Sequence, residues 1–225
     1  MVQIITKYGM MLVQAMGQTL LLALLGLIFG SILGVIFGLL SVVKNKACNV
    51  ISVIYVNLIR GVPMLVLAMF VYIGVPYALN QFFGAGVKLT SLAAGTICLA
   101  LNCGAYMAEI IRAGIQAIDP GQMEAARSLG LTYWRGMFRV VLPQAIKNMI
   151  PSIVNQFIIT LKDTSILSVI GFPELVNKAQ NVIGITFKSF QVWAIVGVMY
   201  LIVILILQRV AKILERRLNR GRKAR

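Results

Sequence analysis

Charged residues are scarce in this 225-residue chain, and histidine is absent. Only 12% of the residues are charged whereas 60% are hydrophobic, and the mean hydropathy is +0.91. Soluble domains usually carry about 25% charged residues, so this composition excludes an ordinary water-soluble domain. Without histidine, the chain lacks the commonest metal ligand and general base. We therefore expect a membrane protein with no metal site and no catalytic centre.

Cysteine is also rare. Cys48, Cys98 and Cys103 lie in apolar surroundings, form no disulfide framework and lack the spacing of metal ligands. No basic n-region precedes a short apolar core with a small-residue cleavage site, so we predict no cleaved signal peptide.

Acidic residues are few, and the charge balance is strongly basic. The chain has 21 Lys and Arg against 6 Asp and Glu, which gives a net charge of +15. In a soluble protein this excess would suggest nucleic-acid binding. Here the basic residues lie between apolar runs, and the aromatic residues form no stacking platform. Membrane topology explains the charge better, so nucleic acid is not an expected partner.

Five segments are apolar enough to cross a membrane. A spanning helix needs about 20 apolar residues, at a rise of about 1.5 Å each. Four segments of this length contain no charged residue: 8–43, 61–87, 89–108 and 189–208. A fifth, 140–168, contains three charged residues and two prolines: Lys147, Lys162, Asp163, Pro143 and Pro151. The sequence therefore predicts an all-α membrane protein with about five transmembrane helices, built as one domain over residues 1–225.

The second span has a break in its pattern. Residues 48–59 look helical but lead into the sequence Arg-Gly-Val-Pro at 60–63, where a helix should kink or restart. We interpret 48–59 as an interfacial first part of the second span, and we place the turn before the third span at 82–86. We expect Arg60 to snorkel to the inner surface.

The basic residues also predict the orientation, because cytoplasmic loops are enriched in Lys and Arg. With the N-terminus outside and the C-terminus in the cytoplasm, four basic residues fall outside: Lys7, Lys88, Lys178 and Lys188. Fourteen fall inside: Lys44, Lys46, Arg112, Arg127, Arg135, Arg139, Arg209, Lys212, Arg216, Arg217, Arg220, Arg222, Lys223 and Arg225. Arg60, Lys147 and Lys162 lie too deep to assign.

The first span carries a glycine at every fourth position: Gly26, Gly30, Gly34 and Gly38. Such a stripe lets a second helix approach closely, because contact between helices in lipid depends on fit. The stripe could be a sliding or dimer surface, or it could pack statically inside the bundle. We favour static packing.

A short polar helix is expected at about residues 119–130, in a cytoplasmic loop between the third and fourth spans. Asp119 is a good N-cap, Pro120 suits the first helical position, and Gln122 occupies the third position of a capping box. Gly130 provides a left-handed stop. The helix presents small residues that could enter a groove on another protein. The alternative is an amphipathic helix lying on the membrane.

This helix resembles the EAA loop of the permeases of bacterial ABC importers. Seven residues match the motif and its spacing: Glu124, Ala125, Ala126, Gly130, Val140, Leu142 and Pro143, with Val140 in place of isoleucine. Segments 60–63, 105–115 and 161–165 resemble the polar amino-acid branch of that family.

The resemblance implies the transmembrane permease domain of a type I importer in a bacterial inner membrane. The expected partners are two cytoplasmic ATPase subunits, a second permease that is the same or a related chain, an extracytoplasmic binding protein that delivers an amino acid, and membrane lipid. Glu124, Ala125, Ala126 and Gly130 would form the coupling helix that docks on the ATPase. The chain lacks the phosphate-binding sequence G-x-x-x-x-G-K-[ST], so we expect ATP and Mg to bind the partner ATPase and no cofactor to bind this chain.

Three ionisable residues at membrane depth are candidate substrate contacts, because a charge there costs at least ~2.5–3.5 kcal/mol. Glu109 and Asp163 could meet the ammonium group of an amino acid, and Lys162 its carboxylate, with added hydroxyl groups from Thr164 and Ser165.

A structural role is the alternative, in which Asp163 pairs with a basic residue of the protein and Glu109 pairs with Arg112. The helical rise places Glu109 below the bilayer midplane and Asp163 above it, so one ligand reaches both only if a span is bent. The composition also leaves two other functions open: an ion-coupled secondary amino-acid transporter, although no internal repeat is visible, and a membrane adaptor that transports nothing.

Overall fold

The computed structural model of the protein describes residues 1–43, 45–84 and 86–219, with side chains as far as Ile213. Ala85 of the predicted turn lies outside the described residues. So do five basic residues that were used to predict the orientation: Lys44, Arg220, Arg222, Lys223 and Arg225. Every regular element of the described chain is a helix: α1 (Val2–Leu40), α2 (Lys46–Gly61), α3 (Met64–Met69), η1 (Phe70–Gly74), α4 (Val75–Phe83), α5 (Ser91–Gln116), α6 (Pro120–Ser128), α7 (Tyr133–Gly136), η2 (Met137–Val141), α8 (Leu142–Asp163), η3 (Thr164–Ile170), α9 (Leu175–Thr186) and α10 (Ser189–Asn219).

Five of these helical segments are long and apolar enough to cross a membrane, as predicted. They are Val2–Leu40, Met64–Phe83, Ser91–Gln116, Tyr133–Ile170 and Ser189–Ile213. The third segment extends to Gln116, beyond its predicted end at residue 108. The polar residues after 108 lie on one face of the helix, so they do not end it.

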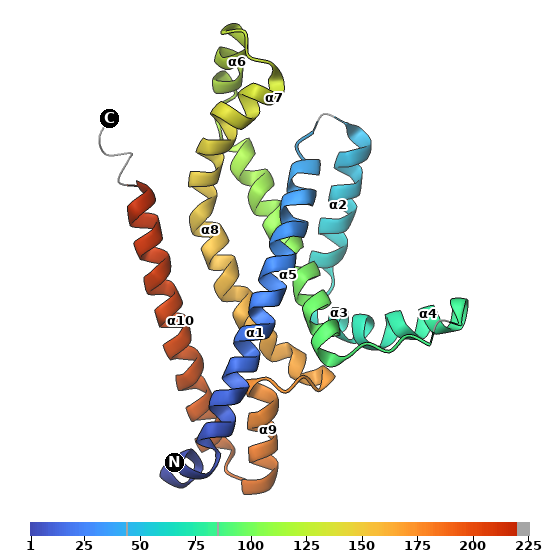
Figure 1. Ribbon diagram of the computed structural model, residues 1–225, viewed down its shortest axis with the longest axis vertical. Coiled ribbons are helices and arrows are strands. Elements are labelled where there is room, and N and C mark those ends of the chain that lie inside the picture. Colours follow the sequence, from blue (N-terminus) through green and yellow to red (C-terminus); the bar gives the residue numbers. More distant parts are fainter. Residues whose placement is uncertain (44, 85, 220–225) are drawn as a thin grey trace.

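The centre of the fold is the close packing of α1 against α5 (Figure 1). Each glycine of the stripe lies against one side chain of α5: Gly26 against Leu99, Gly30 against Cys103, Gly34 against Met107 and Gly38 against Ile111. A Cβ atom on Gly26 would lie 2.5 Å from the Cβ of Leu99, and one on Gly30 would lie 2.8 Å from that of Cys103. The glycines therefore pack statically inside the chain, which confirms the favoured interpretation of the stripe.

Helix α2 lies lengthwise beside α1 and α5 (Figure 1). The Ser52 hydroxyl donates to the carbonyl of Phe37 at 2.7 Å, and the Tyr55 hydroxyl donates to the carbonyl of Leu101 at 2.9 Å. These bonds hold one face of α2, with Ser52, Val56 and Ile59 buried, against the bundle. The interfacial position of residues 48–59 stays a prediction.

The predicted break at residues 60–63 is present. Helix α2 ends at Gly61, and α3 restarts at Met64 after an extended Val62. Pro63 explains the break, since proline has no N–H to donate and disfavours helical geometry at the residue before it. Beyond the break, α3, η1 and α4 turn away from the bundle (Figure 1). Gly84, with φ of +61°, then ends α4 at the predicted turn.

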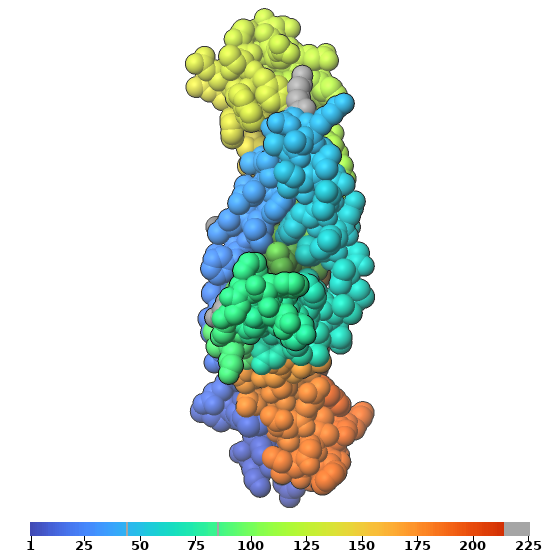
Figure 2. Space-filling model, turned by 90° about the vertical axis from the view of Figure 1, so that its right-hand side faces the viewer, coloured from blue at the N-terminus to red at the C-terminus, as the bar shows by residue number. Residues whose placement is uncertain are grey.

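The molecule is a tall column with two distinct ends. The N-terminus and α9 lie at one end and α6 and α7 at the other, while α4 stands out from the side (Figures 1 and 2). Buried side chains of α1, α9 and α10 form the core at the α9 end. Side chains of α5, η2 and α8 form the core toward α6.

Candidate functional site

Helix α6 forms as the sequence predicts, although the capping box is incomplete. The Asp119 carboxylate accepts a hydrogen bond from the backbone N–H of Gly121 at 2.8 Å, and Gly130 has φ of +83°. The helix covers Pro120–Ser128 within the predicted range. The amide oxygen of Gln122 instead accepts from the side chain of Gln144 at 3.2 Å, so Gln122 ties α6 to α8.

The four predicted coupling residues do not share one surface. Glu124, Ala125 and Gly130 are exposed, whereas Ala126 is only 4% exposed. Ala126 packs against Gly136 of α7, where an added Cβ would lie 3.4 Å from the Cβ of Ala126. Ala126 therefore fixes α6 to α7, while Glu124 and Ala125 are free to contact another protein.

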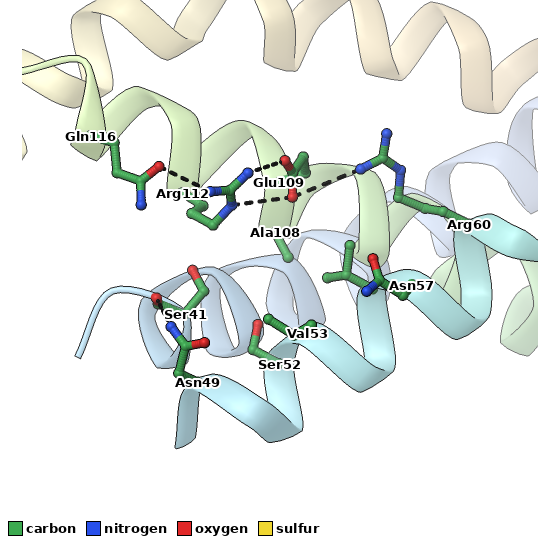
Figure 3. A pocket seen from close by; sticks show the side chains of 11 residues that line it. Ser41, Asn49, Ser52, Val53, Asn57, Arg60, Ala108, Glu109, Arg112 and Gln116 are labelled. Atoms are coloured by element: carbon green, nitrogen blue, oxygen red, sulfur yellow. Dashed lines mark hydrogen bonds and ion pairs between the residues drawn. The ribbon is translucent and has the colours of Figure 1, made fainter. Parts of the chain in front are cut away.

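Glu109 lies in an ion-pair cluster on α5 (Figure 3). Its carboxylate accepts from the guanidinium of Arg112, with Arg112 Nε at 3.3 Å from Glu109 Oε2, and it lies 3.8 Å from Arg60 Nη1. Arg112 also donates to Gln116 at 3.0 Å. This cluster lines a cavity of about 240 Å³ between α2 and α5. The pairing of Glu109 with Arg112 is the one that the structural alternative predicted.

Asp163 lies at a second cavity, of about 370 Å³, at the break between α2 and α3. The amide of Asn102 donates to its carboxylate at 3.3 Å. Within the described part of the chain, Asp163 forms no ion pair, so the structural alternative is not realised for this residue. A carboxylate at membrane depth without a cation is available to a charged ligand.

The other three predicted substrate residues do not line either cavity. Lys162 is exposed, the buried Thr164 hydroxyl donates to the carbonyl of Leu161 at 2.7 Å, and the Ser165 hydroxyl donates to the carbonyl of Lys162 at 2.6 Å. Such local bonds from Ser and Thr to preceding carbonyls are common in helices, and they use the only proton of each hydroxyl group.

Arg60, which we expected to snorkel to the inner surface, connects the two cavities. Its side chain lines both cavities, and its guanidinium lies 4.9 Å from the ring centroid of Tyr106. The sequence contains one signal for this site, since Asn102, Tyr106 and Glu109 follow the i, i+4, i+7 spacing of a single helix face. The carboxylates themselves remain apart, because seven residues of helix separate Asn102 from Glu109, a rise of about 10 Å.

The family model of the "Binding-protein-dependent transport system inner membrane component" matches residues 26–220. The chain belongs to this family. It is therefore a multi-pass inner-membrane component of a binding-protein-dependent transport system, in which the ATPase is a separate subunit.

Individual relatives agree with this family assignment. The "Glutamine transport system permease protein GlnP" of Escherichia coli (strain K12) is 35% identical over 209 residues, which cover 93% of each chain. A chain of the "Crystal structure of an amino acid ABC transporter with histidines" is 38% identical, with a TM-score of 0.86 over 95% of this chain and 96% of that one. The MetNI methionine ABC transporter, at 20% identity and a TM-score of 0.77, shares the fold over 94% of this chain and 97% of its own. Membership of this transport family favours the importer over an ion-coupled secondary transporter.

Proposed function

We propose that this protein is the membrane-spanning permease subunit of an ATP-driven importer for a polar or cationic amino acid. The cavity at the α2–α3 break carries the proposal. It presents Asp163, a carboxylate without an ion pair in the described part of the chain, and the guanidinium of Arg60 from another helix. An amino acid offers the complementary pair of charges. The relatives named for glutamine and for amino acids support this substrate class.

In the proposed complex, Asp163 accepts from the ammonium group and Arg60 donates to the carboxylate. Charge-assisted hydrogen bonds are roughly twice as strong as neutral ones, and a guanidinium matches a carboxylate with two parallel donors. Asn102 holds the Asp163 carboxylate in place at 3.3 Å. Arg60 thus takes the role that the sequence assigns to Lys162, since Lys162 is exposed outside the cavity.

Glu109 has a different proposed role, on the path from the cavity to the cytoplasm. Its cluster with Arg60 and Arg112 lines the neighbouring cavity, which is polar along one side (Figure 3). Arg60 lies 3.8 Å from Glu109, a loose contact that a ligand carboxylate can replace. Release of the amino acid would return Arg60 to Glu109.

Helix α6 is the proposed coupling element to the ATPase. Glu124 and Ala125 form its exposed contact surface, while the buried Ala126 and the left-handed Gly130 fix its position on α7. The proposed assembly has two ATPase subunits, which bind ATP and Mg, and two permease subunits. The N-terminus lies outside and α6 in the cytoplasm, in accordance with the basic residues of the loops.

Amino-acid binding to the purified importer tests this site. Arg60→Met should abolish binding and uptake, whereas Lys162→Met, the matched control that removes a neighbouring cation outside the cavity, should leave both near normal. Asp163→Asn should also lose binding while retaining normal expression and ATPase assembly. Loss of binding in Lys162→Met with normal binding in Arg60→Met would reject the proposed assignment.

A further inference from the structure

An apolar groove lies between the last turns of α1 and the segment formed by α7 and η2. Its volume is about 340 Å³, and side chains such as Leu39 and Val42 form one wall while Tyr133, Trp134 and Phe138 form the other. Trp134 and Phe138 are 56% and 58% exposed, and their rings stack with centroids 6.1 Å apart. The groove is therefore open to the surroundings and has one aromatic wall.

The position of the groove suggests an interfacial ligand. The elements that form its walls, α7 and the last turns of α1, lie toward the α6 end of the column (Figure 1). Tryptophan and tyrosine are enriched where the hydrocarbon core meets the headgroups. The groove is thus placed for an acyl chain that enters from the membrane with its headgroup near α7.

The charges around the groove favour an anionic headgroup. Arg135 and Arg139 are exposed and follow directly on the wall residues Trp134 and Phe138. Neither wall contains an acidic residue, and the chain has none from residue 125 to residue 162. Basic pockets on the cytoplasmic side of membrane proteins bind phosphate-bearing lipid headgroups.

We propose that this groove binds an anionic phospholipid of the inner leaflet, with an acyl chain against Trp134 and Phe138 and the phosphate near Arg135 and Arg139. Only the choice of the inner leaflet rests on the proposed function, in which α6 and α7 lie on the cytoplasmic side. Because the lipid would lie beside α7, on which Ala126 of the coupling helix packs, it would support the position of α6.

Tryptophan fluorescence can test the proposal directly, because the chain has only two tryptophans, Trp134 and Trp193. In a Trp193→Phe variant of the full chain, all tryptophan emission comes from Trp134. The protein is titrated in mixed micelles with phosphatidylglycerol or phosphatidylcholine carrying bromine atoms near the headgroup, which quench a tryptophan in contact. Phosphatidylglycerol should quench at the lower concentration.

The arginines should account for this preference. Arg135→Gln together with Arg139→Gln should lower the preference for phosphatidylglycerol by about fivefold per arginine, the effect of one basic residue near an anionic surface. The matched control is Arg209→Gln with Lys212→Gln, which removes two exposed charges of α10 that do not line the groove. The control should retain the preference.

Three outcomes would overturn the proposal. Equal quenching by the two lipids would mean non-selective lipid contact, and no quenching by either would mean that protein, such as a second copy of the chain, covers the groove. An unchanged preference in the arginine variant would remove the headgroup site. Because the titration needs neither transport nor ATPase, its failure is distinct from failure of the proposed importer function.

Discussion

Replacing Gly30 by alanine should test the central contact between α1 and α5. The added Cβ would lie 2.8 Å from the Cβ of Cys103 and 3.0 Å from its Sγ. Ordinary contacts begin at 3.4 Å, so the two helices must separate by about 0.6 Å at this level. Overpacking of this kind costs about 1–3 kcal/mol of stability.

Gly17→Ala is the matched control on the same helix, because an added Cβ at Gly17 meets nothing within 4 Å. Both variants gain the same helix propensity, about 1 kcal/mol for alanine over glycine. Their difference in stability therefore isolates the packing cost. For a chain of this size, about 1–3 kcal/mol corresponds to a fall in Tm of several degrees, at roughly 2–4 °C per kcal/mol.

A thiol-reactive dye provides the assay, since Cys98 and Cys103 are fully buried in the folded protein and react only when it opens. Cys48 is only partly buried, so it is replaced by serine in every protein compared. The purified permease is heated in detergent with the dye, and the reaction midpoint is compared among the parent protein and the two glycine variants. Gly30→Ala should react at the lowest temperature and Gly17→Ala at or above the temperature of the parent protein. Equal midpoints for the two variants would refute the close α1–α5 packing.

Three further predictions concern the ends of the column. Ala125→Trp should leave the permease stable but weaken co-purification of the ATPase. Ala126→Trp should instead destabilise the permease itself, because Ala126 is buried against α7. Equal stability of the two variants would contradict this packing. In a background without native cysteines, Ser189→Cys should react with a membrane-impermeant thiol reagent added from outside. Leu129→Cys should react only after permeabilisation. The reverse pattern would show that the chain has the opposite orientation. Burial raises the pKa of Glu174, the fully buried N-cap of α9, above the ordinary glutamate pKa of the unfolded chain. Between these two pKa values the folded protein binds more protons than the unfolded chain does. The stability of the protein should therefore fall as the pH rises from the ordinary pKa through the raised one. Glu174→Gln should flatten this dependence in thermal melts at several pH values, and an unchanged profile would assign it to another group.

The site itself could be predicted only in part. The depth of Glu109 and Asp163 in apolar spans marked both as candidates, and the polar face of Asn102, Tyr106 and Glu109 was readable from helical spacing. The role of Arg60 was not readable. Its neighbours Glu109 and Tyr106 are more than forty residues away in sequence, and only the packing of α2 against α5 brings them within 3.8 Å and 4.9 Å.

The sequence by itself determined the features that depend on local chemistry. Apolar length defined the five spans, Pro63 defined the break after α2, and Asp119 and Gly130 defined the two ends of α6, because each effect acts over a few neighbouring residues. The tertiary structure decided which side of each helix faces another helix. It turned Ala126 inward, placed the glycine stripe against α5 and put Arg60 in the lining of both cavities. These outcomes depend on contacts between distant segments, and a helix in lipid can bury any face that finds a closely fitting partner.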